Sequence, residues 1–239
     1  DEIIDMAEKK IFDVLQSRAA KGYASIKDIL VDTFENIEKL YNSKSNVSGM
    51  ESGFKDLDLK TSGLNNSDLI IVAARPAMGK SAFALNIARN VAVQSKKTVC
   101  FFSLEMTRDQ LAQRMLSNEV SIESEKLRTG DLTTDEWTRL AQAGTNLAAS
   151  QIYFDETPGI TVPEMKAKLR RVNGGKVDLV VIDYLGLMQS ARKTENRVQE
   201  VSDITRNLKA MAKELGVPVI ACAQLSRGTE TKGKSHKPA

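Results

Sequence analysis

The stretch from Ile70 to Ala88 reads IIVAARPAMGKSAFALNIA, an apolar run followed by a short polar break and then by apolar residues at helical spacing. The break matches the phosphate-binding pattern G-x-x-x-x-G-K-[ST], except that Ala74 stands at the first glycine. A strand that leads through such a loop into a helix offers the free N–H groups of the helix start to a phosphate. This feature predicts an α/β fold with a nucleotide site.

Each part of this loop has an expected role. Gly79 lets the backbone approach the phosphates, Lys80 contacts the β- and γ-phosphates, and the Ser81 hydroxyl binds Mg²⁺. Gly-Lys-Ser also occurs by chance in ordinary loops, but the strand and helix on either side favour a working site. The residues expected to contact the nucleotide are Ala74, Arg75, Pro76, Ala77, Met78, Gly79, Lys80, Ser81 and Ala82.

Composition bounds the class of protein. The 239 residues are 41% hydrophobic, which is enough for one α/β domain with an appendage. No apolar run has the length of a membrane span and the N-terminal stretch does not resemble a signal peptide, so we expect a cytoplasmic protein. Cys100 and Cys222 lie inside apolar runs, which predicts buried thiols. A net charge of +3 is too small to indicate a nucleic-acid partner by itself.

The chain from Asp68 onward alternates apolar runs with helical patterns, which predicts a parallel sheet with helices on its faces. The expected strands are Leu69–Ala73, Thr98–Ser103, Ile152–Phe154, Leu179–Ile182 and Val219–Ala223. Capping boxes are expected at Thr107 with Gln110, Thr133 with Glu136 and Thr161 with Glu164, and Gly216 is expected to end the last helix.

Two amphipathic helices are expected before this sheet, over residues 1–20 and from Ser25 to Tyr41. The polar stretch NSKSNVSG follows the second helix and reads as a linker. The apolar side of that second helix needs a groove, either on its own domain or on another subunit, and the pattern leaves both open.

Polar residues follow every predicted strand, and a ligand of an open parallel sheet lies outside the carboxyl ends of its strands. Asp183 is expected to hold Mg²⁺ opposite Ser81, and Glu105 is expected to activate the attacking water. Gln224 is expected to contact the γ-phosphate and pass its presence to the next loop, although it could simply be a solvated strand end. Asp155 and Glu156 follow the third strand.

Two basic loops lie beyond these strand ends. Mobile lysines and arginines with few aromatic neighbours favour salt-sensitive binding of nucleic-acid phosphates with little sequence preference, but exposed loops are often basic anyway. The basic stretch Lys166–Arg171 is interpreted as a solvated helix face. The residues expected to bind a nucleic acid are Arg192, Lys193, Arg197, Arg227, Lys232, Lys234 and Lys237.

Six stretches carry a family resemblance: ARPAMGKSAFALNIA, FSLEM, LRTGDLT, DETPGI, VVIDYLGLMQ and PVIACAQLSRG. In order and spacing they resemble the bacterial and phage replicative DNA helicases of the DnaB type. The resemblance implies a RecA-like ATPase that forms a homo-hexameric ring around single-stranded DNA and uses ATP and Mg²⁺ to translocate and unwind the duplex. It also accounts for Ala74, because the family's loop commonly reads A-R-P-x-M-G-K-[ST].

The resemblance assigns the same roles to Lys80, Ser81, Glu105, Asp183 and Gln224, and makes the basic loops DNA loops of a central channel. It implies that residues 1–22 are the last helix of an N-terminal domain, 23–47 a linker helix and linker that dock on the neighbouring subunit, and 48–239 the RecA-like domain. Primase and a helicase loader are the implied partners. The arginine finger is expected beyond residue 239, so a C-terminally incomplete domain with an open sheet edge is expected.

Two other functions remain open. One is a recombinase-like or clock-like RecA relative, and the other is a scaffold that binds ATP without turnover. The linker helix and the stretch DYLGLMQ favour the helicase over the first alternative. Glu105 together with Asp183 argues against the scaffold, which has no need of a catalytic base.

Overall fold

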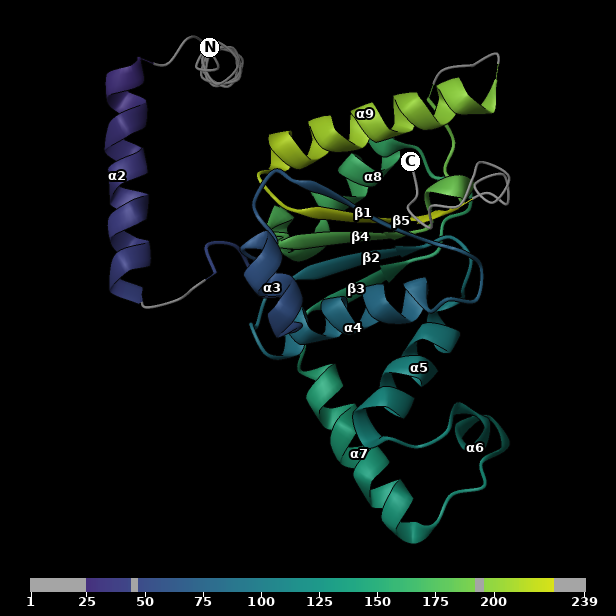
Figure 1. The fold of residues 1–239 in the computed structure, drawn as a ribbon. Helices are drawn as coiled ribbons and strands as arrows, with labels where there is room; N and C mark the ends of the chain where they lie inside the picture. The colour runs from purple at the N-terminus through teal and green to yellow at the C-terminus, as the bar shows by residue number, and fades with distance from the viewer. Residues whose placement is uncertain (1–24, 44–46, 192–195, 226–239) are drawn as a thin grey trace, which may run out of the picture. The chain divides into compact units, whose positions relative to one another are not determined.

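The computed structural model describes residues 25–43, 47–191 and 196–225 (Figure 1). Contacts divide the chain into two compact units, Asp1–Asn46 and Val47–Ala239. The helix predicted over residues 1–20 lies outside the described residues. So do six of the residues predicted to bind DNA, namely Arg192, Lys193, Arg227, Lys232, Lys234 and Lys237.

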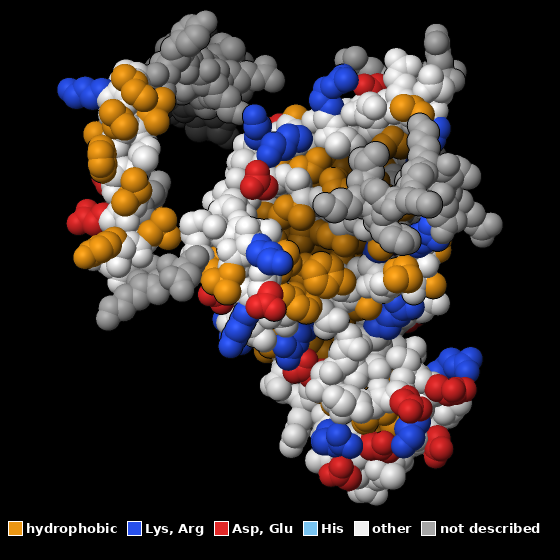
Figure 2. All heavy atoms as spheres, viewed as in Figure 1, with side chains coloured by type: hydrophobic (Ala, Val, Ile, Leu, Met, Phe, Trp, Pro, Cys, Tyr) orange, Lys and Arg blue, Asp and Glu red, His pale blue; other side chains and the backbone are white. Residues whose placement is uncertain are grey.

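Helix α2, Ile26–Ser43, confirms the amphipathic helix predicted from Ser25. Its large apolar side chains recur every three or four residues, so they form a row along the helix. Figure 2 shows this row of hydrophobic side chains. The exposed members are Ile26, Ile29, Leu30, Phe34, Ile37, Leu40 and Tyr41.

The second unit is built on a five-stranded, fully parallel sheet in the order β1-β5-β4-β2-β3 (Figure 1). All five predicted strands are confirmed, and four of them extend one residue further at the carboxyl end than expected. Asp155, Asp183 and Gln224 therefore belong to the strands that they were expected to follow. The bounds are β1 Leu69–Ala74, β2 Val99–Ser103, β3 Ile152–Asp155, β4 Leu179–Asp183 and β5 Val219–Gln224.

Helices cover both faces of this sheet. One apolar layer joins the sheet to α4 and α5, and the other joins it to α8 and α9. Every residue of β4 is buried between these two layers, so the core lies on both sides of this central strand. The helices are α3 Lys55–Thr61, α4 Lys80–Val93, α5 Arg108–Val120, α6 Ser124–Thr129, α7 Thr134–Ala148, α8 Val162–Leu169 and α9 Arg197–Leu215, with short 3₁₀ turns η1 Val172–Gly175 and η2 Leu185–Leu187.

The helix ends that were predicted from capping residues are confirmed. All three capping boxes form, and Gly216 ends α9 with a φ of 67°, in the left-handed region that favours glycine. None of the described helices is long and apolar enough to span a bilayer.

The basic stretch Lys166–Arg171 is partly a solvated face, as interpreted, because Arg170 and Arg171 are exposed, but three of its cations also have partners. Helix α8 ends at Leu169, and the cations on and just beyond it bind carboxylates of neighbouring elements. Lys166 and Arg170 both pair with Glu214 of α9, while Lys168 pairs with Asp155 of β3. These cations therefore attach α8 to α9 and to the end of β3.

Strand β1 forms one edge of the sheet, because within the described residues it pairs only with β5. An apolar cavity of about 470 Å³ lies along β1, and its lining includes Leu57, Ile71, Phe83 and Ile87.

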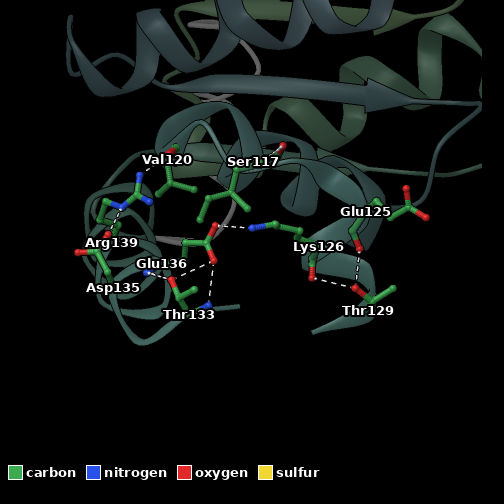
Figure 3. Close-up of polar contacts among 10 residues, drawn as sticks. Ser117, Val120, Glu125, Lys126, Thr129, Thr133, Asp135, Glu136 and Arg139 are labelled. Atoms are coloured by element: carbon green, nitrogen blue, oxygen red, sulfur yellow. Dashed lines mark hydrogen bonds and ion pairs between the residues drawn. The ribbon is translucent and has the colours of Figure 1, made fainter. Parts of the chain in front are cut away.

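A polar cluster around Glu136 joins helices α6 and α7 (Figure 3). The Glu136 carboxylate accepts hydrogen bonds from the Thr133 backbone N–H at 2.8 Å and from Lys126 Nζ at 2.9 Å. The backbone N–H of Thr133 and, next, the Lys126 ammonium lower the pKa of Glu136 from 4.5 to about 2. Folding therefore favours the ionised form of this carboxyl group.

This pKa predicts how stability responds to acid. The contribution of Glu136 is fully present above pH 4.5 and is lost as the pH falls toward 2, because the unfolded chain takes up the proton first. Glu136→Gln should lower the Tm at pH 7, and the difference from the unsubstituted protein should shrink between pH 4.5 and 2. Thermal unfolding followed by circular dichroism measures this.

The matched control is Glu125→Gln. Glu125 lies on α6 and forms an exposed ion pair with Arg128, and exposed pairs contribute little. Its substitution should change the Tm little at any pH. Parallel pH curves for Glu136→Gln and the unsubstituted protein would contradict the assignment.

Candidate nucleotide-binding site

The parallel sheet brings the predicted site residues together along one edge, the one formed by the carboxyl ends of its strands. Ala74 is paired in register with Gln224 on the neighbouring strand, and Ser103 is paired with Asp183. Since neighbouring strands lie about 4.8 Å apart, the phosphate loop after β1, Gln224 on β5 and Asp183 on β4 are successive features of the same edge. Glu105 follows β2 at that edge.

The phosphate loop has the backbone geometry that an anion requires. Gly79 precedes α4 with a φ of 83°, and Ala77 has a φ of 61°. No side chain caps the start of α4, and the first N–H groups of a helix have no partner within it. A Cβ built on Gly79 would meet nothing within 4 Å. The free donors and this open space suit a phosphate group at the start of the 14-residue helix.

Asp183 lies on the same side of the sheet as α4. Leu179 and Val181 belong to the apolar layer under α4, and side chains alternate along a strand, so Asp183 points the same way. Lys80 is the first residue of α4 and is 8% exposed. The lysine and the carboxylate therefore share one face of the sheet.

Asp183 and Lys80 both influence the thiol of Cys222. Burial raises the pKa of its thiol to about 12; the Asp183 carboxylate adds to the rise and the Lys80 ammonium opposes it. Cys222 is fully buried on β5, between β1 and β4. Lys80 and Asp183 are thus both near enough to this buried thiol to influence its pKa.

The Asp183 carboxylate is the least satisfied polar group in this region. Both of its oxygens are buried, and neither makes a hydrogen bond of good geometry among the described residues; the Cys222 thiol is near enough only for a weak one, which adds to its raised pKa. Burying an ionised carboxylate without partners costs free energy, which a bound cation would offset. Mg²⁺ prefers oxygen ligands and is usually held by one or two carboxylates together with substrate phosphates. Asp183 and the hydroxyl of half-buried Ser81 are donors of this kind.

Glu105 is exposed at the same edge. Leu104 packs into the layer beside α8 and α9, whereas Met106 packs into the layer beside α4. Glu105 therefore lies between two side chains that are anchored on opposite faces of the sheet. Gln224, the last residue of β5, is also exposed. Both side chains are accessible to water and to a ligand.

Arg197 is the one residue predicted to bind DNA that the described ranges include. Its guanidinium donates to the Gly186 carbonyl at 2.6 Å and pairs with Glu200 at 2.5 Å. Hydrogen bonds from Arg197 and from the Ser190 backbone lower the pKa of Glu200. Arg197 thus joins the start of α9 to the turn after β4, and its contact with DNA stays a prediction.

A family model described as the DnaB-like helicase C-terminal domain matches residues 49–239. The chain belongs to this family. It is similar to the replicative DNA helicase DnaC of Bacillus subtilis (strain 168), with 49% identity over 234 residues, and to the replicative DNA helicase DnaB of Geobacillus stearothermophilus, with 50% identity over 234 residues. These matches cover 97% of the chain and 52% of each relative. The chain spans about half the length of these curated relatives.

Solved structures share the fold. A DnaB-like replicative helicase, solved in a study of its interactions with primase, is similar with a TM-score of 0.78 and 33% identity over 99% of this chain and 60% of that one. A second solved structure, of an ATPase domain, is similar with a TM-score of 0.81 and 35% identity over 88% of this chain and 75% of that one. The predicted RecA-like sheet is therefore confirmed as that of a DnaB-like domain.

Sequence reasoning missed two residues of this DnaB-like site. Ser103 and Cys222 lie beside Asp183 in the sheet, and both were assigned only to apolar strands. Period-two alternation from the strand ends could have placed them on the α4 side. It could not have shown which strands are neighbours, because that depends on the strand order.

The open space at Gly79 predicts that a substitution there weakens nucleotide binding by more than it lowers stability. Gly79→Ala forces a left-handed φ on a residue with a Cβ, which should cost about 1 kcal/mol of stability, and it places a methyl group where a phosphate would approach. Nucleotide affinity should therefore fall at least tenfold. Isothermal titration calorimetry with ADP measures the affinity and thermal unfolding measures the stability.

Gly216→Ala is the matched control. Gly216 also has a left-handed φ and open space around an added Cβ, but it lies at the end of α9. It should lose similar stability and keep its nucleotide affinity. Equal nucleotide affinity in both variants would show that the phosphates do not bind at this loop.

Proposed function

We propose that this chain is the motor part of a ring-forming replicative DNA helicase, which uses ATP and Mg²⁺ to translocate on single-stranded DNA and unwind the duplex. The observation that carries the proposal is the buried, unpartnered carboxylate of Asp183 on the same face as Lys80 at the start of α4. Membership of the DnaB-like family and relatives named as replicative DNA helicases support it.

The nucleotide roles follow from this arrangement. Lys80 and the backbone N–H groups of the loop would hold the β- and γ-phosphates, and Ser81 and Asp183 would hold Mg²⁺. The bound metal would neutralise the charge that develops on the transferred phosphoryl group. Glu105 is exposed where it could take a proton from the attacking water, and Gln224 is exposed where it could contact the γ-phosphate.

The proposed DNA contacts are the basic loops that follow β4 and β5. Both loops leave the edge that carries the nucleotide site, so a change at the γ-phosphate has a short path to them through Gln224. Such coupling between hydrolysis and DNA contact is what a translocating motor requires.

The proposed assembly is a homo-hexamer. The exposed apolar row of α2 needs a covering surface, and we assign this role to the neighbouring subunit. Primase is a proposed partner, because a similar DnaB-like helicase was solved in a study of its interactions with primase. We also propose that a helicase loader is a partner and that the protein acts in the cytoplasm.

Steady-state ATPase measurements on the complete protein, with and without single-stranded DNA, test this function. Hydrolysis that DNA stimulates supports a motor. Nucleotide binding without turnover under both conditions would instead support the ATP-gated scaffold and overturn the proposal.

Glu105→Gln should separate binding from chemistry. The amide keeps the shape of the side chain but cannot accept the proton, so turnover should fall by at least about 100-fold while nucleotide affinity stays within about twofold. Glu214→Gln is the control, because Glu214 pairs with Lys166 and Arg170 near the end of α9. It should keep full turnover. Hydrolysis retained by Glu105→Gln would remove Glu105 from the mechanism.

Neutralising Lys232, Lys234 and Lys237 together should weaken binding to single-stranded DNA. Removal of each phosphate contact should reduce the slope of log K against log salt by about 0.7. Fluorescence anisotropy with labelled oligonucleotides over a range of salt concentrations measures this slope. Neutralising the exposed lysines Lys55, Lys60 and Lys176 is the control. An unchanged slope in the first variant would place the DNA elsewhere.

A further inference from the structure

The Ser103 hydroxyl closes the turn that carries Glu105. Ser103 is the last residue of β2 and is 1% exposed. Its Oγ donates a hydrogen bond to the Met106 carbonyl at 2.6 Å and accepts one from the Met106 N–H at 3.3 Å. One side chain thus holds both backbone groups of the residue that follows Glu105.

The start of the same turn is attached to β4. The Leu104 N–H donates to the Asp183 carbonyl at 2.7 Å, and Ser103 lies directly opposite Asp183 in the register. The backbone before Glu105 is therefore held by the residue whose carboxylate is proposed to bind Mg²⁺. The far side of the turn then decides where the Glu105 side chain points.

Beyond Met106 the chain is fixed independently. Thr107 and Gln110 form the capping box of α5. The Glu156 carboxylate accepts from the Arg108 backbone N–H at 3.0 Å and pairs with the Arg108 guanidinium at 2.8 Å. Between these two fixed ends, Ser103 is the one side chain in the described structure that bonds the backbone of residues 104–106.

A buried hydroxyl at Ser103 is unexpected, because its neighbours in this layer are apolar. Val99 and Phe101, the residues of β2 that point the same way as Ser103, belong to the apolar layer under α4. A buried hydroxyl is tolerated in such a layer only if it is hydrogen-bonded, and an apolar side chain would contribute more by burial.

We propose that Ser103 is a positioning residue for Glu105, setting the direction of its carboxylate relative to Asp183 through the backbone of Met106. This inference rests on the proposed ATPase function. A displacement of about 1 Å at a reacting group can lower a rate about 100-fold. Loss of the hydroxyl should therefore reduce the chemical step and leave nucleotide binding intact.

Ser103→Ala in the complete protein tests the proposal. The kcat for ATP in the presence of single-stranded DNA should fall at least tenfold, while the KM for ATP and the affinity for ADP stay within twofold. Ser103→Thr keeps the hydroxyl and should restore kcat to within about threefold of the unsubstituted protein. Circular dichroism and thermal unfolding confirm that both variants are folded before their rates are compared.

Ser117→Ala is the matched control. Ser117 is also buried, and its hydroxyl donates to the Ile122 backbone carbonyl just beyond α5, at the opposite end of that helix from the Glu105 turn. Its substitution should lower stability and leave kcat unchanged. A kcat for Ser103→Ala no lower than that for Ser117→Ala, or a Ser103→Thr variant as slow as Ser103→Ala, would overturn the positioning role. Absence of turnover in the unsubstituted protein would overturn the proposed function instead.

Discussion

The pairing of β2 with β4 is the constraint on which the candidate site depends. In this register Ser103 lies opposite Asp183, and the Asp183 carbonyl accepts a hydrogen bond from Leu104. The backbone of Asp183 therefore holds the start of the Glu105 turn, while its carboxylate points to the side of α4. A shift of one residue in this pairing would turn the side chains of β4 to the opposite face. The carboxylate would then face α8 and α9.

The buried surroundings of Asp183 strengthen the electrostatic interactions that its carboxylate can make. Strand β4 is buried along its whole length between two apolar layers, and these layers contribute the burial free energy that offsets an unsatisfied charge. Electrostatic interactions in such a dry position are stronger than in water. Cys222, which is fully buried in the apolar layer beside α4, lies in the same environment. A dry, preorganised site of this kind suits phosphoryl transfer, in which catalysis is largely positioning and charge stabilisation.

The two exposed apolar features have different physical origins. The row on α2 belongs to an 18-residue helix whose periodic pattern is complete within its own sequence. The apolar cavity beside β1 arises because β1 is an edge strand with one unpaired side among the described residues. The apolar row on α2 follows from local periodicity, whereas the cavity beside β1 exists only because of the strand order.

Local interactions allowed the sequence by itself to determine much of this protein. The five strands, the three capping boxes, the end of α9 at Gly216 and the turn from β1 into α4 all depend on residues within a few positions of one another, and all could be read from the sequence. The polar residues at the strand ends could be named for the same reason. The sequence did not reveal contacts between distant partners: Lys166 and Lys168 of α8 pair with Glu214 and Asp155, and the Ser103 hydroxyl bonds the backbone of Met106.

Only the tertiary structure decided the strand order and therefore the neighbours of each strand end. Strand β4 lies between β5 and β2, so Asp183 meets a turn that is about 80 positions earlier in the chain. Sequence patterns report which side chains are apolar and how they alternate, but they do not report which strand lies next to which. That choice depends on how the helices bury both faces of the whole sheet at once. Burial on this scale is a property of the complete fold, and it places the buried carboxylate of Asp183 on the same face of the sheet as Cys222 and the start of α4.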